Sequence, residues 1–315
     1  MLQTLRKSGT LFGFIAIIVF FAVQLPDTFL TPRNLINISQ QLSMLAVVAV
    51  TMTIVMVMND FDLSVGSMAS LAGIVAATLF ALGFPVWAGI LGALLVGLAG
   101  GLLNGFLVSV IGILPFVATL GTLTVFSGTA FLISDGKTIF GRDIPTTFSG
   151  FARGGIAFGD VKIPFLTITA AVVICMCWFI LEQTNFGRRL YAIGGNKEAA
   201  HLAGIKVKRL RFIAFGLTGL GAAGAGLMYA ARVASANPTQ GSGLMLDAIA
   251  AVFLGMTMSR QGEPRVIFTL VGVLILGILD NGLTQMQVDS YIREILVGVI
   301  VIAAVAIASF SKNRA

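Results

Sequence analysis

Long apolar stretches alternate with short polar ones along almost the whole chain. A helix crosses the hydrocarbon core of a bilayer with roughly 20 apolar residues, and about ten stretches reach or approach that length. They fall near residues 10–26, 40–58, 66–84, 86–111, 114–134, 164–181, 212–232, 245–258, 265–285 and 291–310. Because the eighth stretch is short, hydropathy alone also permits about nine or eleven spans. The pattern predicts an all-α membrane protein with about ten transmembrane helices in a single domain over residues 1–315.

The composition supports the assignment to a membrane. The chain is 57% hydrophobic and only 10% charged, whereas a soluble domain carries roughly 25% charged residues. It therefore lacks the polar surface that water requires. The formal net charge is +7, but the basic residues cluster beside apolar stretches, where they set the orientation of the spans. For this reason we expect no nucleic-acid partner.

The distribution of Lys and Arg predicts the orientation. With the N-terminus in the cytoplasm, the cytoplasmic segments carry thirteen basic residues and the outer segments carry seven. Cytoplasmic segments of membrane proteins are enriched in Lys and Arg, so both termini are expected to be cytoplasmic. Residues 135–163 then form the largest outer loop, and residues 182–211 form a cytoplasmic loop.

A weak internal repeat relates two parts of the chain. A shift of 177 residues aligns the pair Asn104-Gly105 with the pair Asn281-Gly282. The shift moves an odd number of spans, so spans two to five and seven to ten would have opposite orientations. Inverted repeats of this kind place the substrate path of many transporters at the repeat interface. Because the chain has 37 glycines, a chance alignment is the alternative.

Glycines also recur at helical spacing inside two of the predicted spans. Gly97, Gly101 and Gly105 follow one another every four residues, and five more glycines lie between 216 and 226. Small residues at this spacing let helix backbones approach closely. We interpret them as packing positions rather than as part of a chemical site.

Polar side chains in the apolar parts of the chain are the candidates for a translocation path. An ionisable residue at the bilayer centre costs at least ~2.5 kcal/mol on insertion scales, so it needs a reason. Residues 59–66 fit either a broken or re-entrant helix along an aqueous path, or a cytoplasmic turn in which Asp62 or Ser64 caps the next helix. Asn104 and Asn281 fit either hydrogen bonds between helices or contacts with a substrate. The candidate path residues are Asn59, Asp60, Phe61, Asp62, Ser64, Asn104, Asp247 and Asn281.

The residues that catalysis requires are scarce. The chain has one His, His201, which falls in the predicted cytoplasmic loop. No metal cluster, nucleophile–base pair or phosphate-binding glycine loop can be assembled from the sequence. We therefore expect neither an enzyme nor a cofactor bound by this chain.

The cytoplasmic loop contains a short helix with a cap at each end. Residues 182–211 hold seven of the twenty Lys and Arg residues, which makes the segment too charged for lipid and predicts that it is exposed to water. Asn196 is a good N-cap and Gly204 suits the position after the C-terminus of a helix. A helix of two turns is marginal alone. It lies either on the bilayer surface or in a groove of a soluble partner.

At this point the residues resemble a known family. Glu198-Ala199-Ala200, followed by Gly204, looks like the EAA loop of ABC-transporter permeases, whose coupling helix inserts into an ATPase subunit. The wider pattern is similar to the ribose-type sugar permeases of bacteria along essentially the whole chain. It is carried by residues 184–188, 191–196, 62–67, 134–137 and 247–252.

The resemblance implies an importer of the bacterial inner membrane. It implies a second copy of the permease, a cytoplasmic ATPase that binds ATP and Mg, and a periplasmic binding protein that delivers a monosaccharide or polyol. Residues 135–163 would be periplasmic, and 182–211 would be the coupling loop. The residues that the resemblance assigns to ATPase coupling are Asn196, Glu198, Ala199, Ala200 and Gly204.

The chain departs from this family in two places. Residues 59–61 read Asn-Asp-Phe where the family has Gly-Gly-Ile, and residues 256–264 replace a glycine-rich turn. Both changes fall near the expected path, so the sugar stays unassigned. One alternative function is a self-sufficient secondary transporter or facilitator, which explains the repeat but not the capped helix. A purely structural membrane subunit is a third reading, and the intramembrane polar residues argue against it.

Overall fold

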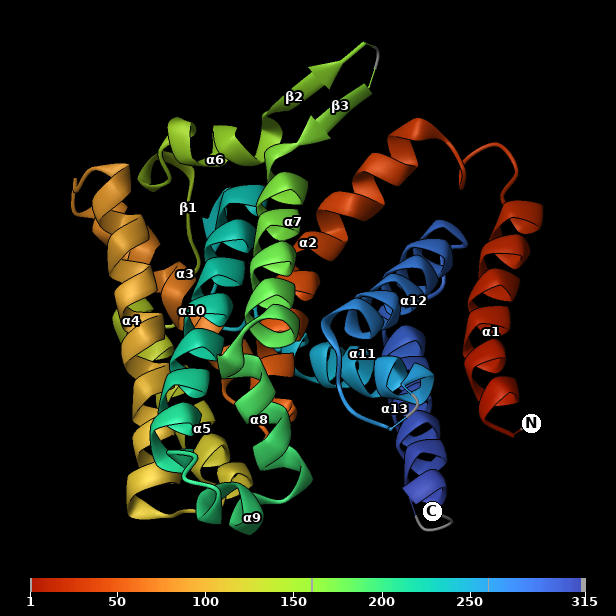
Figure 1. Ribbon diagram of the computed structural model, residues 1–315. Coiled ribbons are helices and arrows are strands. Elements are labelled where there is room, and N and C mark those ends of the chain that lie inside the picture. The colour runs from red at the N-terminus through yellow and green to blue at the C-terminus, as the bar shows by residue number, and fades with distance from the viewer. Residues whose placement is uncertain (1, 160, 260, 313–315) are drawn as a thin grey trace.

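The computed structural model describes residues 2–159, 161–259 and 261–312, most of them in helices. The helices are α1 (Leu2–Gln24), α2 (Pro32–Met56), α3 (Val65–Ala81), α4 (Val86–Phe106), α5 (Pro115–Ser134), α6 (Thr146–Arg153), α7 (Phe165–Trp178), α8 (Asn185–Gly195), α9 (Lys197–Leu202), α10 (Val207–Val233), α11 (Leu244–Met258), α12 (Val266–Gln285) and α13 (Ser290–Lys312). Figure 1 shows them as one bundle. Short π-helical turns, Leu107–Ile111 and Phe179–Gln183, extend α4 and α7, and Gly141–Asp143 form a 3₁₀ turn.

The ten predicted apolar stretches all lie on helices, but these helices differ in length. Among the described residues, six helices are long and apolar enough to span: Pro32–Met56, Val86–Ile111, Pro115–Ser134, Phe165–Gln183, Val207–Val233 and Val266–Gln285. Three apolar helices are shorter: Thr10–Gln24, Val65–Ala81 and Leu244–Met258. The count of about ten spans therefore stays a prediction.

The prediction of a purely helical chain is incomplete, because two small antiparallel sheets form in the loops. β2 (Gly155–Phe158) pairs with β3 (Val161–Pro164) as a hairpin, and β1 (Ile139–Phe140) pairs with β4 (Ser235–Ala236). Gly159, at the turn of the hairpin, has a φ of 60°, which glycine adopts without steric cost. The hairpin and α6 belong to the predicted outer loop 135–163 and project from one end of the bundle in Figure 1.

Helix α2 is the centre of the bundle. Every residue from Leu42 to Met56 is buried, because α2 packs on α7, α10, α11 and α12. A helix that is apolar on all sides is suited to such a position. In Figure 1 it crosses the middle of the molecule, with α3, α4, α5 and α10 on one side and α11, α12 and α13 on the other.

Helices α2 and α10 run antiparallel to each other, and each packs on helices from the other part of the chain. Arg232 bonds Asn37 at one end (3.4 Å), and Thr218 donates to the Thr51 carbonyl in the middle (3.1 Å). α10 packs on α3 and α4, whereas α2 packs on α11 and α12. The first helix of each predicted repeat therefore packs on helices of the other predicted repeat.

The glycine pattern brings α4 and α10 into backbone contact, as predicted. A Cβ atom added at Gly101 would lie 2.3 Å from the Phe215 carbonyl oxygen, and one at Gly219 would lie 2.2 Å from the Gly97 carbonyl oxygen. These distances are shorter than any van der Waals contact. Only glycine fits at these positions.

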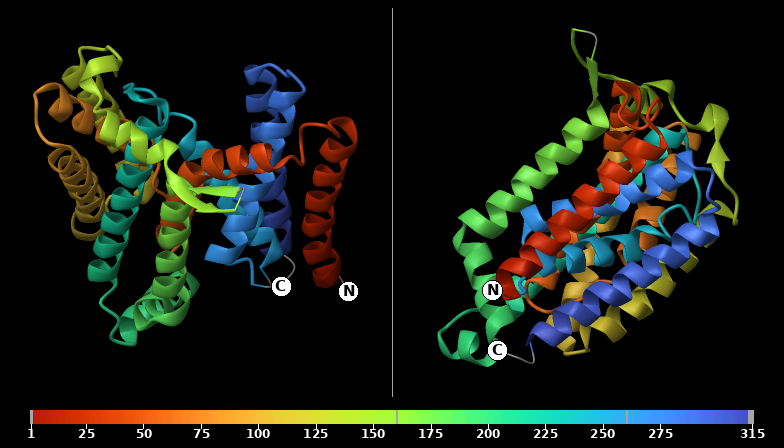
Figure 2. Two further views of the ribbon diagram at one scale, coloured as in Figure 1. Left: turned by 90° about the horizontal axis from the view of Figure 1, so that it is seen from above. Right: turned by 90° about the vertical axis from the view of Figure 1, so that its right-hand side faces the viewer.

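The two ends of the bundle carry different features. Helix α1 begins and α13 ends at the end where α8 and α9 lie, and the hairpin and α6 lie at the opposite end; both Figure 1 and the right-hand view of Figure 2 show this arrangement.

Candidate functional site

The connection between α2 and α3, residues 57–64, is polar, and all of it is buried except Asn59 and part of Phe61. Asp60 is 5% exposed, Asp62 1% and Ser64 2%. The chain leaves α2 through Asn59, whose φ is 60°. Asp62 Oδ1 then accepts a bond from the Ser64 backbone N–H (3.0 Å) just before α3. The segment is therefore a turn held by a buried carboxylate. Neither Asp62 nor Ser64 caps α3 as the sequence allowed, because Asp62 accepts the bonds of Ser64 itself and the Ser64 side chain makes no capping bond to the helix.

Asp62 belongs to a buried hydrogen-bond network between α3, α4 and α5. The Ser64 hydroxyl donates to Asp62 Oδ1 (2.6 Å), and Asn104 Nδ2 donates to Ser64 Oγ (2.8 Å). Thr122 donates to Asn104 Oδ1 (2.6 Å). Asn104 is fully buried, and its amide oxygen and nitrogen both have partners. Its observed contacts are bonds between helices, one of the two roles that the sequence left open.

Asp60 forms a bidentate ion pair with Arg211 of α10. Arg211 Nε and Nη2 lie 2.7 Å from Asp60 Oδ2 and Oδ1, respectively. Both side chains are at least nine-tenths buried. The prediction that residues 182–211 are all exposed to water is wrong for Arg211, because it turns inward to neutralise a carboxylate.

The neighbours of Asp60 contact further helices. Asn59 donates to the Gly194 carbonyl at the end of α8 (2.7 Å). The Phe61 ring stacks on Phe253 of α11, with centroids 6.1 Å apart, and the Phe61 carbonyl accepts a bond from Thr119 of α5 (3.3 Å). Residues 59–64, which we call the α2–α3 hub, thus contact α4, α5, α8, α10 and α11.

The short capped helix predicted in the cytoplasmic loop is confirmed as α9. The Asn196 side chain accepts a bond from the Ala199 N–H (2.9 Å), and Gly204 ends the helix with a φ of 81°. Ala200 is buried against the bundle, whereas Glu198, Ala199 and Gly204 are exposed. The apolar side chain of Leu202 is 87% exposed.

Helix α8, which was not predicted, connects α9 to the second part of the chain. The Tyr191 hydroxyl donates to the Pro264 carbonyl between α11 and α12 (2.9 Å). Burial, and then the nearby Glu182 carboxylate, raise the pKa of Tyr191 well above its usual value. The phenol therefore stays protonated and keeps this bond.

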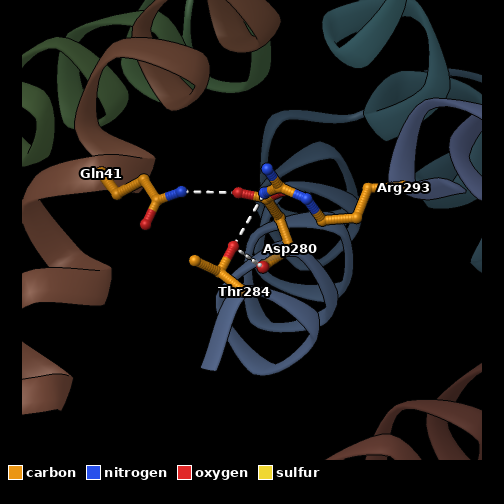
Figure 3. A network of polar contacts seen from close by, with 4 residues as sticks. All are labelled: Gln41, Asp280, Thr284 and Arg293. Atoms are coloured by element: carbon orange, nitrogen blue, oxygen red, sulfur yellow. Dashed lines mark hydrogen bonds and ion pairs between the residues drawn. The ribbon is translucent and has the colours of Figure 1, made fainter. Parts of the chain in front are cut away.

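A second polar network lies toward the opposite end of the bundle. Asn281 of α12 exchanges hydrogen bonds with Asn34 of α2 (3.0 and 3.2 Å). Next to it, Asp280 accepts from Gln41 of α2 (2.6 Å) and pairs with Arg293 of α13. Figure 3 shows Arg293 also bonding Thr284, so that three helices meet at one carboxylate. The structure does not bring Asn281 together with Asn104.

A small cavity of about 150 Å³ lies between α3, α5 and the segment that precedes α11. Leu63 of the α2–α3 hub contributes to its wall. Its polar lining consists of five hydroxyl side chains: Ser67, Ser70, Ser127, Thr239 and Ser242. Ser242 is exposed, in the polar segment that precedes α11. Asp247, in the first turn of α11, is only partly buried and follows Met245 of the cavity wall.

Sequence reasoning missed the partners of the predicted polar residues. Arg211 and Thr122 complete two buried contacts, and Asn34 completes a partly buried one. One signal pointed to the first of them, because a buried carboxylate requires a nearby cation. The cavity hydroxyls had no signal, because Ser and Thr are common in membrane helices. Within the described part of the chain, no three His, Cys, Asp or Glu residues gather as a metal site.

Comparison with known proteins assigns the chain to a family. The family described as "branched-chain amino acid transport system / permease component" matches residues 34–305. The ribose import permease protein RbsC of Bacillus subtilis is 38% identical, over 96% of this chain and 92% of its own. The L-arabinose ABC transporter permease protein AraH of Azospirillum brasilense is 33% identical, over 99% and 90%. The galactose/methyl galactoside import permease protein MglC of Escherichia coli is 32% identical, over 99% and 96%.

The fold has a counterpart among solved structures. A chain of a metal-chelate type ABC transporter in an inward-facing conformation superposes with a TM-score of 0.55, over 96% of this chain and 99% of that chain. At 15% identity, this likeness concerns the fold alone. The family match and the relatives that cover nearly its full length show that the chain belongs to the sugar ABC-transporter permeases.

Proposed function

We propose that this chain forms the membrane path by which a monosaccharide or related polyol enters a bacterial cell. It acts with a second copy of itself, a cytoplasmic ATPase that binds ATP and Mg, and a periplasmic sugar-binding protein. Its relatives are named as permeases for ribose, L-arabinose and galactose, which supports a sugar as the substrate. Family membership also favours this function over a self-sufficient facilitator.

The proposed topology has about ten spans, with both ends of the chain in the cytoplasm. Three features support it: the antiparallel contact of α2 and α10, the exchange of these helices between the repeats, and the position of the chain ends beside α9 (Figure 1). An antiparallel pair of equivalent helices is what an inverted repeat requires. Residues 135–163 are then periplasmic.

The hydroxyl-lined cavity carries the proposal of a path. The two segments that meet there, the start of α3 and the approach to α11, occupy similar places in the two proposed repeats. Hydroxyl groups both donate and accept hydrogen bonds, so Ser67, Ser70 and Ser242 can replace the water around a sugar without a fixed charge. A cavity with few polar groups on an apolar wall is the usual form of a small-molecule site.

The path residues predicted from the sequence fall into three groups. In the first group, residues 59–64 and Asn104, Leu63 lines the cavity and Asn104 is bonded to Ser64. Asp247 stands beside the cavity on α11, and Asn281 holds the far end of α2. We propose that the first group shapes the path through the hub, and that Asp247 is the polar side chain best placed to meet substrate.

The exposed side of α9 is the proposed docking site for the ATPase. Glu198, Ala199 and Leu202 are exposed there, and an exposed leucine on a capped helix is suited to a groove in a partner. Asn196 and Gly204 hold the ends of this helix, and Ala200 anchors it on the bundle. Movement of the ATPase on binding ATP would then act on the permease at α9.

Reconstitution tests the function. Proteoliposomes containing the chain with its ATPase subunit and binding protein should take up at least one of D-ribose, D-allose, L-arabinose and D-galactose, and only with ATP inside. Liposomes with the permease alone are the matched control. Uptake by the permease alone, unchanged by ATP, would contradict the proposal and favour a facilitator.

A further inference from the structure

The Asp60–Arg211 pair is a costly way to hold the fold together. Removing two charges from water carries a penalty that their attraction repays only with good geometry, and well-packed apolar residues of similar size often stabilise a protein as well. This pair has bidentate geometry with both contacts at 2.7 Å. Stability alone does not require an ion pair here, so we ask what the pair contacts on each side.

On one side, the pair is tied closely to α9. Arg211 lies in the second turn of α10, and α10 starts at Val207, a few residues after α9 ends. The short link is held by backbone bonds, from Ile205 N to the Ala200 carbonyl (3.0 Å) and from Val207 N to the Ile205 carbonyl (2.8 Å). Because this link is short and hydrogen-bonded, a displacement of α9 also displaces Arg211.

The chain just before α9 also contacts the α2–α3 hub. Asn59 bonds the Gly194 carbonyl, just before α9. A Cβ atom added at Gly194 would lie 1.9 Å from the Val57 carbonyl oxygen, so the two backbones touch. The α2–α3 hub is thus connected to the chain on both sides of the docking helix.

On its inner side, the hub reaches the cavity. Asp62 follows Asp60 by two residues and is fixed to Ser64 and Asn104. Leu63, between Asp62 and Ser64, lines the cavity wall. A shift of Asp60 therefore reaches both the start of α3 and the cavity border through a few covalent bonds.

We propose that Asp60 and Arg211 are a positioning pair that transmits movement of α9 into the α2–α3 hub and so couples the ATPase cycle to the sugar path. The inference rests on the proposed docking of an ATPase at α9. The guanidinium fork suits this role, because its two parallel bonds fix orientation as well as distance. Neither residue needs to touch the sugar.

The test removes the pair without leaving a buried charge. The double variant Asp60→Leu/Arg211→Met should fold, since apolar replacements of buried pairs are tolerated. In proteoliposomes with the ATPase subunit and the binding protein, sugar transported per ATP hydrolysed should fall by about tenfold. Co-purification of the ATPase and hydrolysis without binding protein should stay at wild-type levels. The exchanged variant Asp60→Arg/Arg211→Asp should recover part of the coupling.

The matched control is a partly buried ion pair elsewhere in the bundle. Asp280→Leu/Arg293→Met removes a pair of α12 and α13 that has no contact with α8 or α9 in the described residues, and it should leave the coupling ratio unchanged. Wild-type coupling in Asp60→Leu/Arg211→Met would overturn the proposal, because packing alone would then suffice. Loss of the ATPase from that variant would also overturn it, since the pair would then act on docking.

A second measurement does not need a transported sugar. In a Cys175→Ser/Cys177→Ser background, the rate at which a water-soluble maleimide labels Ser242→Cys at the cavity should change when ATP is added to the assembly. The change should disappear in Asp60→Leu/Arg211→Met. If wild-type proteoliposomes take up no sugar but this labelling change is present and depends on the pair, the proposed substrate fails while the coupling stands. An ATP-dependent change that persists without the pair overturns the inference.

Discussion

At the scale of single residues, the buried polar residues of the predicted path are hydrogen-bonded to other polar side chains. Asn104 satisfies Asp62, Ser64 and Thr122 at once. A buried donor or acceptor left without a partner costs about 1–3 kcal/mol. The predicted path residues of the hub therefore stabilise the α2–α3 connection, whatever they contribute to transport.

The change Asn104→Ala should lower the stability of the purified permease by about 1–3 kcal/mol, because the Asp62 and Thr122 groups lose a partner. The melting temperature in detergent measures the effect. Thr124→Ala on α5 is the control, since that hydroxyl is exposed and bonds only the Leu120 carbonyl. Equal shifts for the two variants would show that the Asn104 network does not stabilise the fold.

At the scale of elements, the most extensive helix contact is made by α4 and α10. Their backbones approach at Gly97, Gly101 and Gly219, where no side chain has room. Helices in lipid gain little from burying apolar surface, so close packing supplies much of their association. α9 is the contrasting element, because a cap at each end shapes it and its outer face stays free for a partner.

Two glycine-to-alanine substitutions on α10 should differ in their effect on the stability of the protein. Gly219→Ala places a Cβ atom 2.2 Å from the Gly97 carbonyl oxygen, and overpacking of this kind costs about 1–3 kcal/mol. At Gly224 nothing lies within 4 Å, so Gly224→Ala should be neutral or should stabilise the helix by up to about 1 kcal/mol. Thermal unfolding of both variants in detergent compares them. A neutral Gly219→Ala would mean that α4 and α10 separate easily.

At the scale of the whole molecule, α2 packs on α11 and α12, and α10 packs on α3 and α4, so the two proposed halves exchange their first helices. This exchange holds the two halves together. The α2–α3 hub connects the region around α9 to the first half, and the Tyr191–Pro264 bond connects it to the second half. Movement that enters at one end of the bundle can therefore act on both walls of the cavity.

The proposed orientation in the membrane predicts which residues reagents can reach from each side. In the Cys175→Ser/Cys177→Ser background, a membrane-impermeant maleimide applied to intact spheroplasts should label Thr147→Cys on α6 but not His201→Cys on α9, both of which are exposed positions. Opening the membrane should make His201→Cys reactive. The reverse pattern would invert the topology and place α9 away from any cytoplasmic ATPase.

The sequence by itself determined the features that depend on neighbouring residues. The lengths of the apolar stretches placed the ten main helices, and Asn196, which caps the Ala199 N–H three residues later, specified α9. The motifs of the coupling loop and the Asp62–Ser67 region were enough to indicate the family. These signals are local, because helix formation and capping use bonds within about four residues of the chain.

Only the tertiary structure decided which distant groups meet. Asp60 and Arg211 are 151 residues apart, and Asn34 and Asn281 are 247 apart. Several basic residues of the 182–211 loop had a similar sequence context, and only the packing of α10 against α2 turns Arg211 inward. The cavity hydroxyls likewise come from α3, α5 and the segment that precedes α11. A buried charge or hydroxyl is stabilised by a hydrogen-bond partner. The sequence indicates that such a partner is needed, whereas three-dimensional packing determines which residue supplies it.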